Sequence, residues 1–258
     1  MPESDLGLLI RAAHAAGRVS LEFDGPSAKR WDKPGGAGPV TEADMAVNEE
    51  LRALLRPARP DYGWLSEEDA DTDARLARAR CFLLDPIDGT MGFIEGSSSW
   101  SHALAVVEDG RTVAAVVYLP AMDKLYAAAE GAGATLNGTP IRTSDASTAE
   151  GADVLATRYA MDAKNWRQAV PGFTRHHRPS LAYRLALVAE GRFDAMLTLR
   201  DSWDWDIAAG ALICTEAGAR VTDRRGGTLR FNTAPPRSDG VVAGGPAIHA
   251  DLLAALAP

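Results

Sequence analysis

Two carboxylates stand three residues apart in the stretch "LLDPIDGTMGF", residues 83–93, directly after an apolar run. Pro86 disfavours the α conformation for Asp85, so a strand cannot simply continue into a helix at this point. Gly89 permits a sharp turn after Asp88. The stretch therefore predicts a loop at the end of a buried strand, with both aspartates presented by that loop.

The same loop offers two further oxygen atoms, the backbone carbonyl of Ile87 and the hydroxyl of Thr90. Carboxylate, carbonyl and hydroxyl oxygens are hard ligands of the kind that suit Mg²⁺. The alternative is an ordinary turn with solvated aspartates, because Asp, Pro and Gly are all turn formers. Taken alone, the stretch leaves both interpretations open.

Three other acidic stretches each have a structural explanation. "WLSEED" contains Glu67 and Glu68, which fit an exposed acidic loop or a first helical turn. "VTEAD" places Asp44 three residues after Thr41, the spacing of a capping box at a helix start. "WDWDIAAG" places Asp206 at the start of a predicted helix, where an N-cap Asp is stabilising.

Hydrophobic periodicity predicts the elements that must position these residues. Helices are expected at residues 4–23 with Ser4 as N-cap, from Thr41 to about Pro57, and at 161–170, 180–190, 206–217 and 249–257. Strands are expected at residues 80–85, 102–108, 111–120, 124–130, 134–144, 152–158, 193–199 and 219–223, with a hairpin turn at Asn137-Gly138. The first half reads as an antiparallel meander and the second as alternating strands and helices, so two halves, 1–145 and 146–258, are predicted.

Composition narrows the class of protein. The 258 residues carry a formal net charge of −8, which argues against binding to nucleic acid polymers because these need a cationic face. No stretch approaches the roughly 20 apolar residues of a membrane helix, and the N-terminus does not resemble a signal peptide. Cys81 and Cys214 lie in apolar surroundings and read as reduced core thiols, so we expect a cytoplasmic protein.

Four stretches, "GPVTEAD", "WLSEED", "LLDPIDGTMGF" and "WDWDIAAGALICTEAG", occur in the order and approximate spacing of the inositol monophosphatase superfamily. The resemblance spans roughly residues 5 to 250. It implies an α+β fold, the layered αβαβα sandwich of the sugar-phosphatase and inositol monophosphatase type. Within the superfamily the chain looks most similar to bacterial 3'(2'),5'-bisphosphate nucleotidases and generic inositol-phosphatase-like proteins.

The resemblance also implies roles for individual residues. The implied metal ligands are Glu67, Asp85, the Ile87 carbonyl, Asp88 and Asp206. The implied catalytic residues are Asp44, Glu67 and Thr90, of which Asp44 and Thr90 are linked in the family to activation of the attacking water. The implied substrate-binding residues are Asp88, Gly89, Thr90, Arg200 and Asp206. Crowded carboxylates repel one another unless cations lie among them, so two or three Mg²⁺ ions are expected, with Li⁺ as an inhibitor.

Departures from the family pattern guide the choice of substrate. Leu199 stands where inositol and histidinol phosphatases tend to place a Glu, and Arg200 follows it. Arg200 suits a second anionic group on the substrate, or is a surface side chain at a strand end. The roles of Lys33, in a Gly-rich loop, and of the adjacent His176 and His177 stay open; side chains of neighbours on an extended chain point to opposite faces, which disfavours a shared metal.

These features favour a Mg²⁺-dependent phosphomonoesterase acting on a small phosphorylated metabolite. The first substrate predicted is adenosine 3',5'-bisphosphate, cleaved to AMP. The alternative is inositol-1-monophosphatase activity, followed by histidinol-phosphate or sugar-bisphosphate hydrolysis, or a non-catalytic metal-binding homologue. Relatives commonly form homodimers, and nothing in this sequence establishes whether this chain does.

Overall fold

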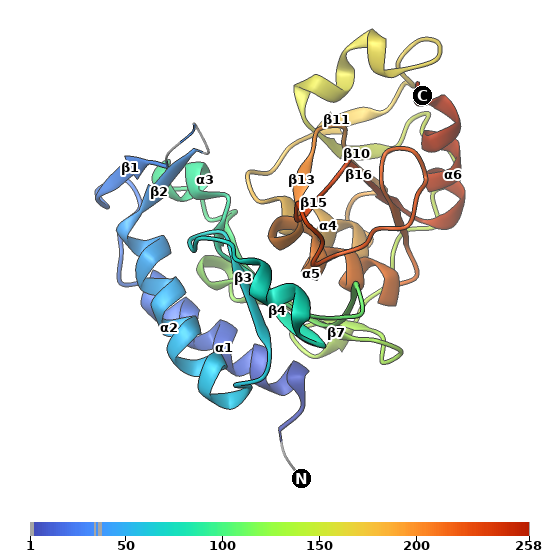
Figure 1. Cartoon of the computed structure of the whole chain (residues 1–258). Coiled ribbons are helices and arrows are strands. Elements are labelled where there is room, and N and C mark those ends of the chain that lie inside the picture. Colours follow the sequence, from blue (N-terminus) through green and yellow to red (C-terminus); the bar gives the residue numbers. More distant parts are fainter. Residues whose placement is uncertain (1–2, 34, 36–37, 258) are drawn as a thin grey trace.

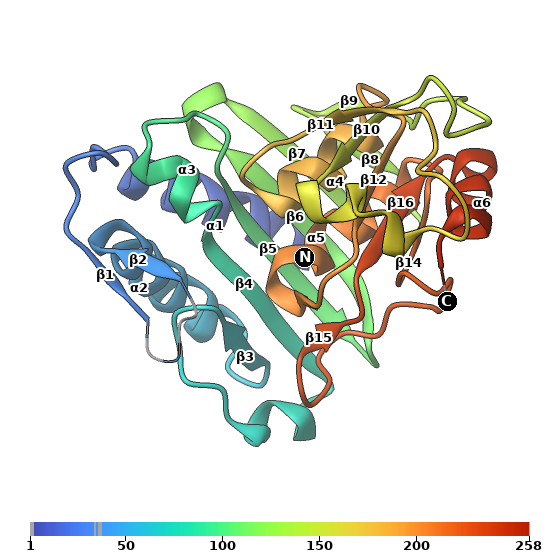
Figure 2. The same cartoon turned by 90° about the horizontal axis from the view of Figure 1, so that it is seen from above.

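The computed structural model describes residues 3–33, 35 and 38–257 of the 258-residue chain. Helices and sheets alternate in five layers, as the views along two perpendicular directions show (Figure 1 and Figure 2). No helix within the described residues combines the length and the apolar character needed to cross a membrane.

A seven-stranded sheet forms the first β layer, in the spatial order β3-β4-β5-β6-β7-β8-β9. Its strands are β3 (Gly63–Ser66), β4 (Arg80–Asp88), β5 (Ser101–Glu108), β6 (Arg111–Leu119), β7 (Lys124–Ala129), β8 (Ala134–Leu136) and β9 (Thr139–Pro140). Strands β3 and β4 are parallel, and the other neighbouring pairs are antiparallel. Helices α1 (Asp5–Ser20) and α2 (Glu42–Ala58) cover one face, whereas α4 (Leu181–Ala189) and α5 (Asp204–Glu216) cover the other.

A five-stranded sheet forms the second β layer, in the order β11-β10-β12-β16-β14. Its strands are β10 (Asp153–Ala156), β11 (Thr174–His176), β12 (Ala195–Thr198), β14 (Arg220–Thr222) and β16 (Val241–Gly244), and α6 (Pro246–Ala255) packs on it as the outer layer. The remaining elements are β1 (Arg30–Asp32), β2 (Pro39–Thr41), α3 (Thr90–Ile94), β13 (Ser202–Trp203) and β15 (Arg237–Ser238). The alternation of helical and sheet layers confirms the predicted αβαβα sandwich.

Strand β4 is apolar on both faces because it lies between two helical layers. Cys81 and Leu83 belong to the core shared with α4 and α5, whereas Phe82 and Leu84 belong to the core shared with α1 and α2. This alternation follows from the two-residue period of a strand. A continuous apolar run such as this one is what a strand buried on both faces requires.

The local signals for the starts of α1 and α2 are confirmed. Ser4 caps α1 by accepting a hydrogen bond from the Gly7 N–H at 3.1 Å. Thr41 and Asp44 form a reciprocal capping box at the start of α2, although Glu or Gln is the usual partner. Helix α1 ends at Ser20 rather than at residue 23, and α2 continues one residue past Pro57.

The predicted helix at residues 161–170 is wrong. The chain forms two short 3₁₀ turns instead, Arg158–Met161 and Ala163–Asn165. The side chain of Trp166 donates to the Ala160 carbonyl at 2.7 Å, and its backbone forms a β-bridge with Leu256. Helix propensity is a weak preference, and these tertiary contacts override it.

The hairpin turn at Asn137-Gly138 is confirmed, since both residues have positive φ angles and separate β8 from β9. The predicted division into residues 1–145 and 146–258 stays a prediction. Helices α4 and α5 follow residue 145 in the chain, yet they pack against both sheets.

Candidate metal and phosphate site

Asp85 and Asp88 lie inside β4 and not in a loop after it, so the predicted loop is instead a bulge within the strand, residues 85–88. The register of β4 against β5 shifts between Asp85 and Asp88, where Pro86 interrupts the ladder. The buried His102 contacts the Pro86 carbonyl through Nδ1 and the Ser20 hydroxyl through Nε2. Burial lowers the pKa of His102 to about 4, so the ring is neutral and fixes the bulge by hydrogen bonding rather than by charge.

Three carboxylates from distant parts of the chain converge at this bulge. One carboxylate oxygen from each of Glu67, Asp85 and Asp206 lies within 4.8 Å of the others. Glu67 directly follows β3, and its N–H donates to the Leu84 carbonyl of the parallel neighbour β4 at 3.1 Å. Asp206 arrives in the first turn of α5. The convergence expected for these three residues is therefore present.

The electrostatics of this group fit a cation. Burial raises the pKa of Asp85 well above its usual range, and the charges of Glu67, Asp88 and Asp206 raise it further. Desolvation likewise raises the pKa of Asp206, with Asp88 and Glu67 as the next causes. Asp85 Oδ1 is buried and has no hydrogen-bond partner among the described residues. An all-oxygen, anionic donor set with a free oxygen matches a hard divalent cation such as Mg²⁺.

Asp88 is held differently from the other three acids. Its carboxylate accepts hydrogen bonds from the Ser180 hydroxyl at 2.6 Å and from the N–H groups of Leu181 at 3.1 Å and Ala182 at 2.6 Å. Burial nevertheless raises the pKa of Asp88 to about 6. Asp88 thus lies beside the three-carboxylate group, bound to the start of α4, and its charge acts on Asp85.

Asp44 and Thr90 form the second part of the site. The Thr90 hydroxyl lies 3.3 Å from Asp44 Oδ1 and 3.0 Å from the Ile87 carbonyl. Burial raises the pKa of Asp44, partly offset by its hydrogen bonds from Thr41. Gly89, at φ 93°, is the N-cap of α3, which begins at Thr90. A Cβ on Gly89 would lie 2.9 Å from the Ser180 nitrogen, so a larger residue would disturb the contact between β4 and α4.

Lys33, whose role the sequence left open, pairs with two acidic residues. Its ammonium donates to Glu67 Oε1 at 2.7 Å and to Glu68 Oε1 at 2.8 Å. Burial raises the pKa of Glu68 to about 7, although Lys33 opposes that shift. The Lys33 ammonium therefore lies beside the Glu67 carboxylate. Its positive charge offsets part of the negative charge of Glu67, Asp85 and Asp206.

Several supporting residues were not predicted from the sequence. Ser180 caps α4 and also binds Asp88, and the buried Arg184 donates to the Arg178 carbonyl at 2.6 Å and the Pro179 carbonyl at 3.1 Å. A Ser before an apolar helix is a recognisable cap signal, but it does not reveal which carboxylate the hydroxyl also contacts.

The remaining predicted residues lie in other settings. The guanidinium of Arg200 stacks over the Tyr159 ring at 4.6 Å. His176 contacts Asp153 at 2.8 Å, whereas His177 contacts Arg184 at 2.9 Å, so the adjacent histidines have separate partners.

The N-cap expected at Asp206 is wrong. The N-cap of α5 is Trp203, and Asp206 lies inside the first turn. The helix backbone therefore positions the Asp206 side chain, which does not cap the helix. Trp203 and Trp205 stack at 4.9 Å with nearly parallel rings, which supports a packing role for this pair.

An α+β sandwich with a buried carboxylate group at the junction of its layers defines the structural class. Comparison with known proteins identifies the family. A model described as the inositol monophosphatase family matches residues 4–258. The chain belongs to the inositol monophosphatase family. Its relatives hydrolyse phosphoric monoesters, and the chain is a phosphatase of this kind.

Individual relatives agree with this assignment. An inositol-1-monophosphatase from Rhizobium meliloti is 34% identical, with 86% of each chain covered. The Nus factor SuhB of Escherichia coli (strain K12) is 31% identical over 96% of this chain and 94% of its own. Among solved structures, an IMPase from Thermotoga maritima has a TM-score of 0.81 and 28% identity, covering 95% of this chain and 94% of its own.

Proposed function

We propose that the chain hydrolyses inositol monophosphate in a Mg²⁺-dependent reaction. The observation that carries this proposal is the convergence of Glu67, Asp85 and Asp206 within 4.8 Å, next to the Asp44–Thr90 pair. The names of the relatives at 34% and 32% identity, both inositol-1-monophosphatases, support this substrate over adenosine 3',5'-bisphosphate.

Glu67, Asp85 and Asp206 would hold the metal, with Asp88 and the Ile87 carbonyl alongside. Bound Mg²⁺ supplies positive charge that stabilises the phosphoryl oxygens during in-line displacement. The number of ions, predicted as two or three, and inhibition by Li⁺ stay predictions.

The Asp44–Thr90 pair would act on the attacking water. The Thr90 hydroxyl can donate its one hydrogen bond to Asp44 Oδ1 at 3.3 Å or to the Ile87 carbonyl at 3.0 Å, and in either case the lone pairs of its oxygen would accept a hydrogen bond from water. Thr41 holds Asp44 in place through two donors, its N–H at 2.8 Å and its hydroxyl. A water bound to Thr90 in this way would lie within reach of general-base assistance from the Asp44–Thr90 pair.

Adenosine 3',5'-bisphosphate is the second candidate substrate. Leu199 is buried at the position where the family resemblance implies a substrate-binding Glu, so this chain has no carboxylate there for inositol hydroxyls. Arg200, the next residue, is exposed and offers a cation for a second phosphate.

A substrate panel tests the proposal directly. We expect phosphate release from inositol 1-phosphate that requires Mg²⁺, and kcat/KM values across the panel rank the substrates because they report transition-state binding. Glu67→Gln should abolish turnover, whereas Glu22→Gln, at an exposed position on the surface, should not change it. Absence of release from every phosphomonoester tested with metal-loaded enzyme would refute catalysis. A higher kcat/KM for adenosine 3',5'-bisphosphate would reverse the order of the two substrates.

A further inference from the structure

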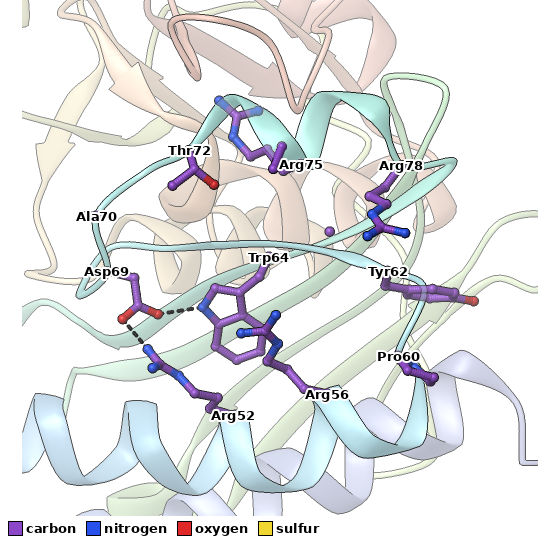
Figure 3. A pocket seen from close by; sticks show the side chains of 12 residues that line it. Arg52, Arg56, Pro60, Tyr62, Trp64, Asp69, Ala70, Thr72, Arg75 and Arg78 are labelled. Atoms are coloured by element: carbon purple, nitrogen blue, oxygen red, sulfur yellow. Dashed lines mark hydrogen bonds and ion pairs between the residues drawn. The ribbon is translucent and has the colours of Figure 1, made fainter.

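A cationic pocket lies between α2 and the segment that follows β3, and the carboxylates described above do not line it. Its volume is about 320 Å³. Arg52 and Arg56 reach it from α2, Arg78 reaches it from the opposite side, and Trp64 stands between them (Figure 3). No ligand of the proposed reaction accounts for a second site of this kind.

Two of the four arginines that line the pocket carry a positive charge that the protein does not neutralise, because Arg52 and Arg75 are ion-paired whereas Arg56 and Arg78 are not. Arg56 and Arg78 form no ion pair or side-chain hydrogen bond with any residue that the structure describes. The Arg52 guanidinium forms ion pairs with Asp69 and, at 3.6 Å, with Glu49, and only its Nε atom is buried without a partner in the described part of the chain. Two guanidinium groups without a protein partner, those of Arg56 and Arg78, therefore face one cavity on a chain whose formal net charge is −8.

The pocket is also held in shape before any ligand arrives. The Trp64 indole N–H donates to Asp69, and the Arg52 guanidinium lies 5.9 Å from the centre of the Trp64 ring. Arg75 fixes the far wall: its guanidinium binds Asp71 at 2.7 and 2.8 Å and Asn232 at 2.7 Å. Preorganised walls reduce the entropy lost when a ligand binds.

We propose that this pocket binds the phosphate group of a small phosphorylated metabolite, and that occupancy is transmitted to the metal site. Guanidinium groups bind phosphate oxygens through paired, charge-assisted hydrogen bonds, which matches the free donors of Arg56 and Arg78. The cavity volume accommodates a phosphate with a small organic group.

A short hydrogen-bond network connects the pocket to the carboxylates. Asp69 accepts from the Asn48 amide at 3.2 Å, and the Asn48 carbonyl oxygen accepts from the Ser66 hydroxyl at 2.8 Å. Ser66 immediately precedes Glu67. A phosphate on Arg52 competes with Asp69 for the guanidinium, and release of Asp69 loosens the support of Glu67. This coupling rests on the metal role proposed for Glu67, whereas binding in the pocket does not.

Binding is tested on metal-free protein, because phosphate binding at the carboxylate group requires cations and binding at the arginines does not. Inorganic phosphate is titrated into the wild type by calorimetry and by tryptophan fluorescence. We expect the R56Q/R78Q double variant to bind at least about tenfold more weakly, the effect of losing one or more charge-assisted hydrogen bonds.

The matched control is Arg18→Gln, since Arg18 is exposed in the last turn of α1 as Arg56 is exposed in the last turn of α2. R18Q should bind phosphate like the wild type. Circular dichroism melts verify that the double variant is folded. Absence of binding to the metal-free wild type up to about 20 mM phosphate would refute phosphate binding in this pocket, and so would equal affinity in R56Q/R78Q.

The coupling is tested by measuring Mg²⁺ affinity at a fixed phosphate concentration in the wild type and in R56Q/R78Q. Phosphate at the carboxylate group contributes equally in both proteins, so a difference between them reports the pocket. We expect phosphate to weaken Mg²⁺ binding by about fivefold more in the wild type. An equal response would overturn the coupling. Failure of both proteins to bind Mg²⁺ would instead refute the metal role of Glu67.

Discussion

Replacing Asp85 by Asn should stabilise the metal-free protein while removing its response to Mg²⁺. Asp85 is buried, has a raised pKa and shares its surroundings with two other acids. The folded metal-free chain therefore binds more protons than the unfolded chain above about pH 4, so these groups lower stability as pH rises. The neutral amide of Asn removes one of the mutually repelling charges.

The magnitude follows from the separation of the charges. At 4.8 Å and an effective dielectric constant of about 20, each ionised pair costs about 3 kcal/mol. Asp85 takes part in two such pairs, with Glu67 and Asp206, and partial protonation relieves part of this repulsion. We therefore expect the free energy of unfolding at pH 8 to rise by about 3 kcal/mol, which corresponds to about 6 to 12 °C in Tm for a chain of this size.

The assay is thermal unfolding in EDTA and in Mg²⁺, at pH 5 and at pH 8. In the wild type, Mg²⁺ at about 100 times its Kd should add about 2.7 kcal/mol, and Asp85→Asn should lose nearly all of this gain. The difference between the two metal-free proteins should shrink at pH 5, where the carboxylates take up protons in the folded state. Turnover should fall below detection in the variant.

Two results would contradict this reasoning. Lower stability of metal-free Asp85→Asn than of the wild type at pH 8 would show that the carboxylates do not repel as the geometry indicates. An undiminished gain from Mg²⁺ would show that the ion binds elsewhere. Asp61→Asn, an exposed position without an ion pair among the described residues, controls for removal of a single negative charge.

Three further changes probe the site and its support. Lys33→Gln should raise Mg²⁺ affinity about fivefold by calorimetry, because the ammonium 2.7 Å from Glu67 repels the ion; weaker binding would contradict this. Thr90→Val should lower kcat by about 10² to 10⁴ while Thr90→Ser retains most activity; equal rates would exclude a role for the hydroxyl. Gly210→Ala should destabilise by about 1–3 kcal/mol in urea unfolding, because its Cβ would lie 2.5 Å from Leu185 Cβ; the usual helix stabilisation by Ala would be the opposite result.

Local sequence signals predicted the elements well where the deciding contacts are close in the chain. The capping residues Ser4 and Thr41, the Asn137-Gly138 turn and the break at Pro86 act on atoms a few residues away. Their conformational preferences therefore survive in the folded protein. The resemblance to the family then supplied the set of acidic residues, which neither periodicity nor composition could have grouped.

Local sequence signals could not predict contacts between residues far apart in the chain. The helix predicted at residues 161–170 fails because Trp166 pairs with Leu256, ninety residues further along the chain. Lys33 meets Glu67 and Glu68 across 34 and 35 residues, and no local pattern indicates that pairing. The arginine pocket likewise combines the end of one helix with a segment beyond the next strand.

The sequence by itself determined which atoms are available: hard oxygen donors that follow an apolar run, on a chain with a formal net charge of −8. Only the tertiary structure decided which of them act together. Packing of α5 against the first sheet brings Asp206 to Asp85, and burial there turns ordinary carboxylates into groups with raised pKa values. The physical reason is that a residue type fixes the charge a side chain can carry, whereas the neighbours and the loss of water fix the free energy of carrying it.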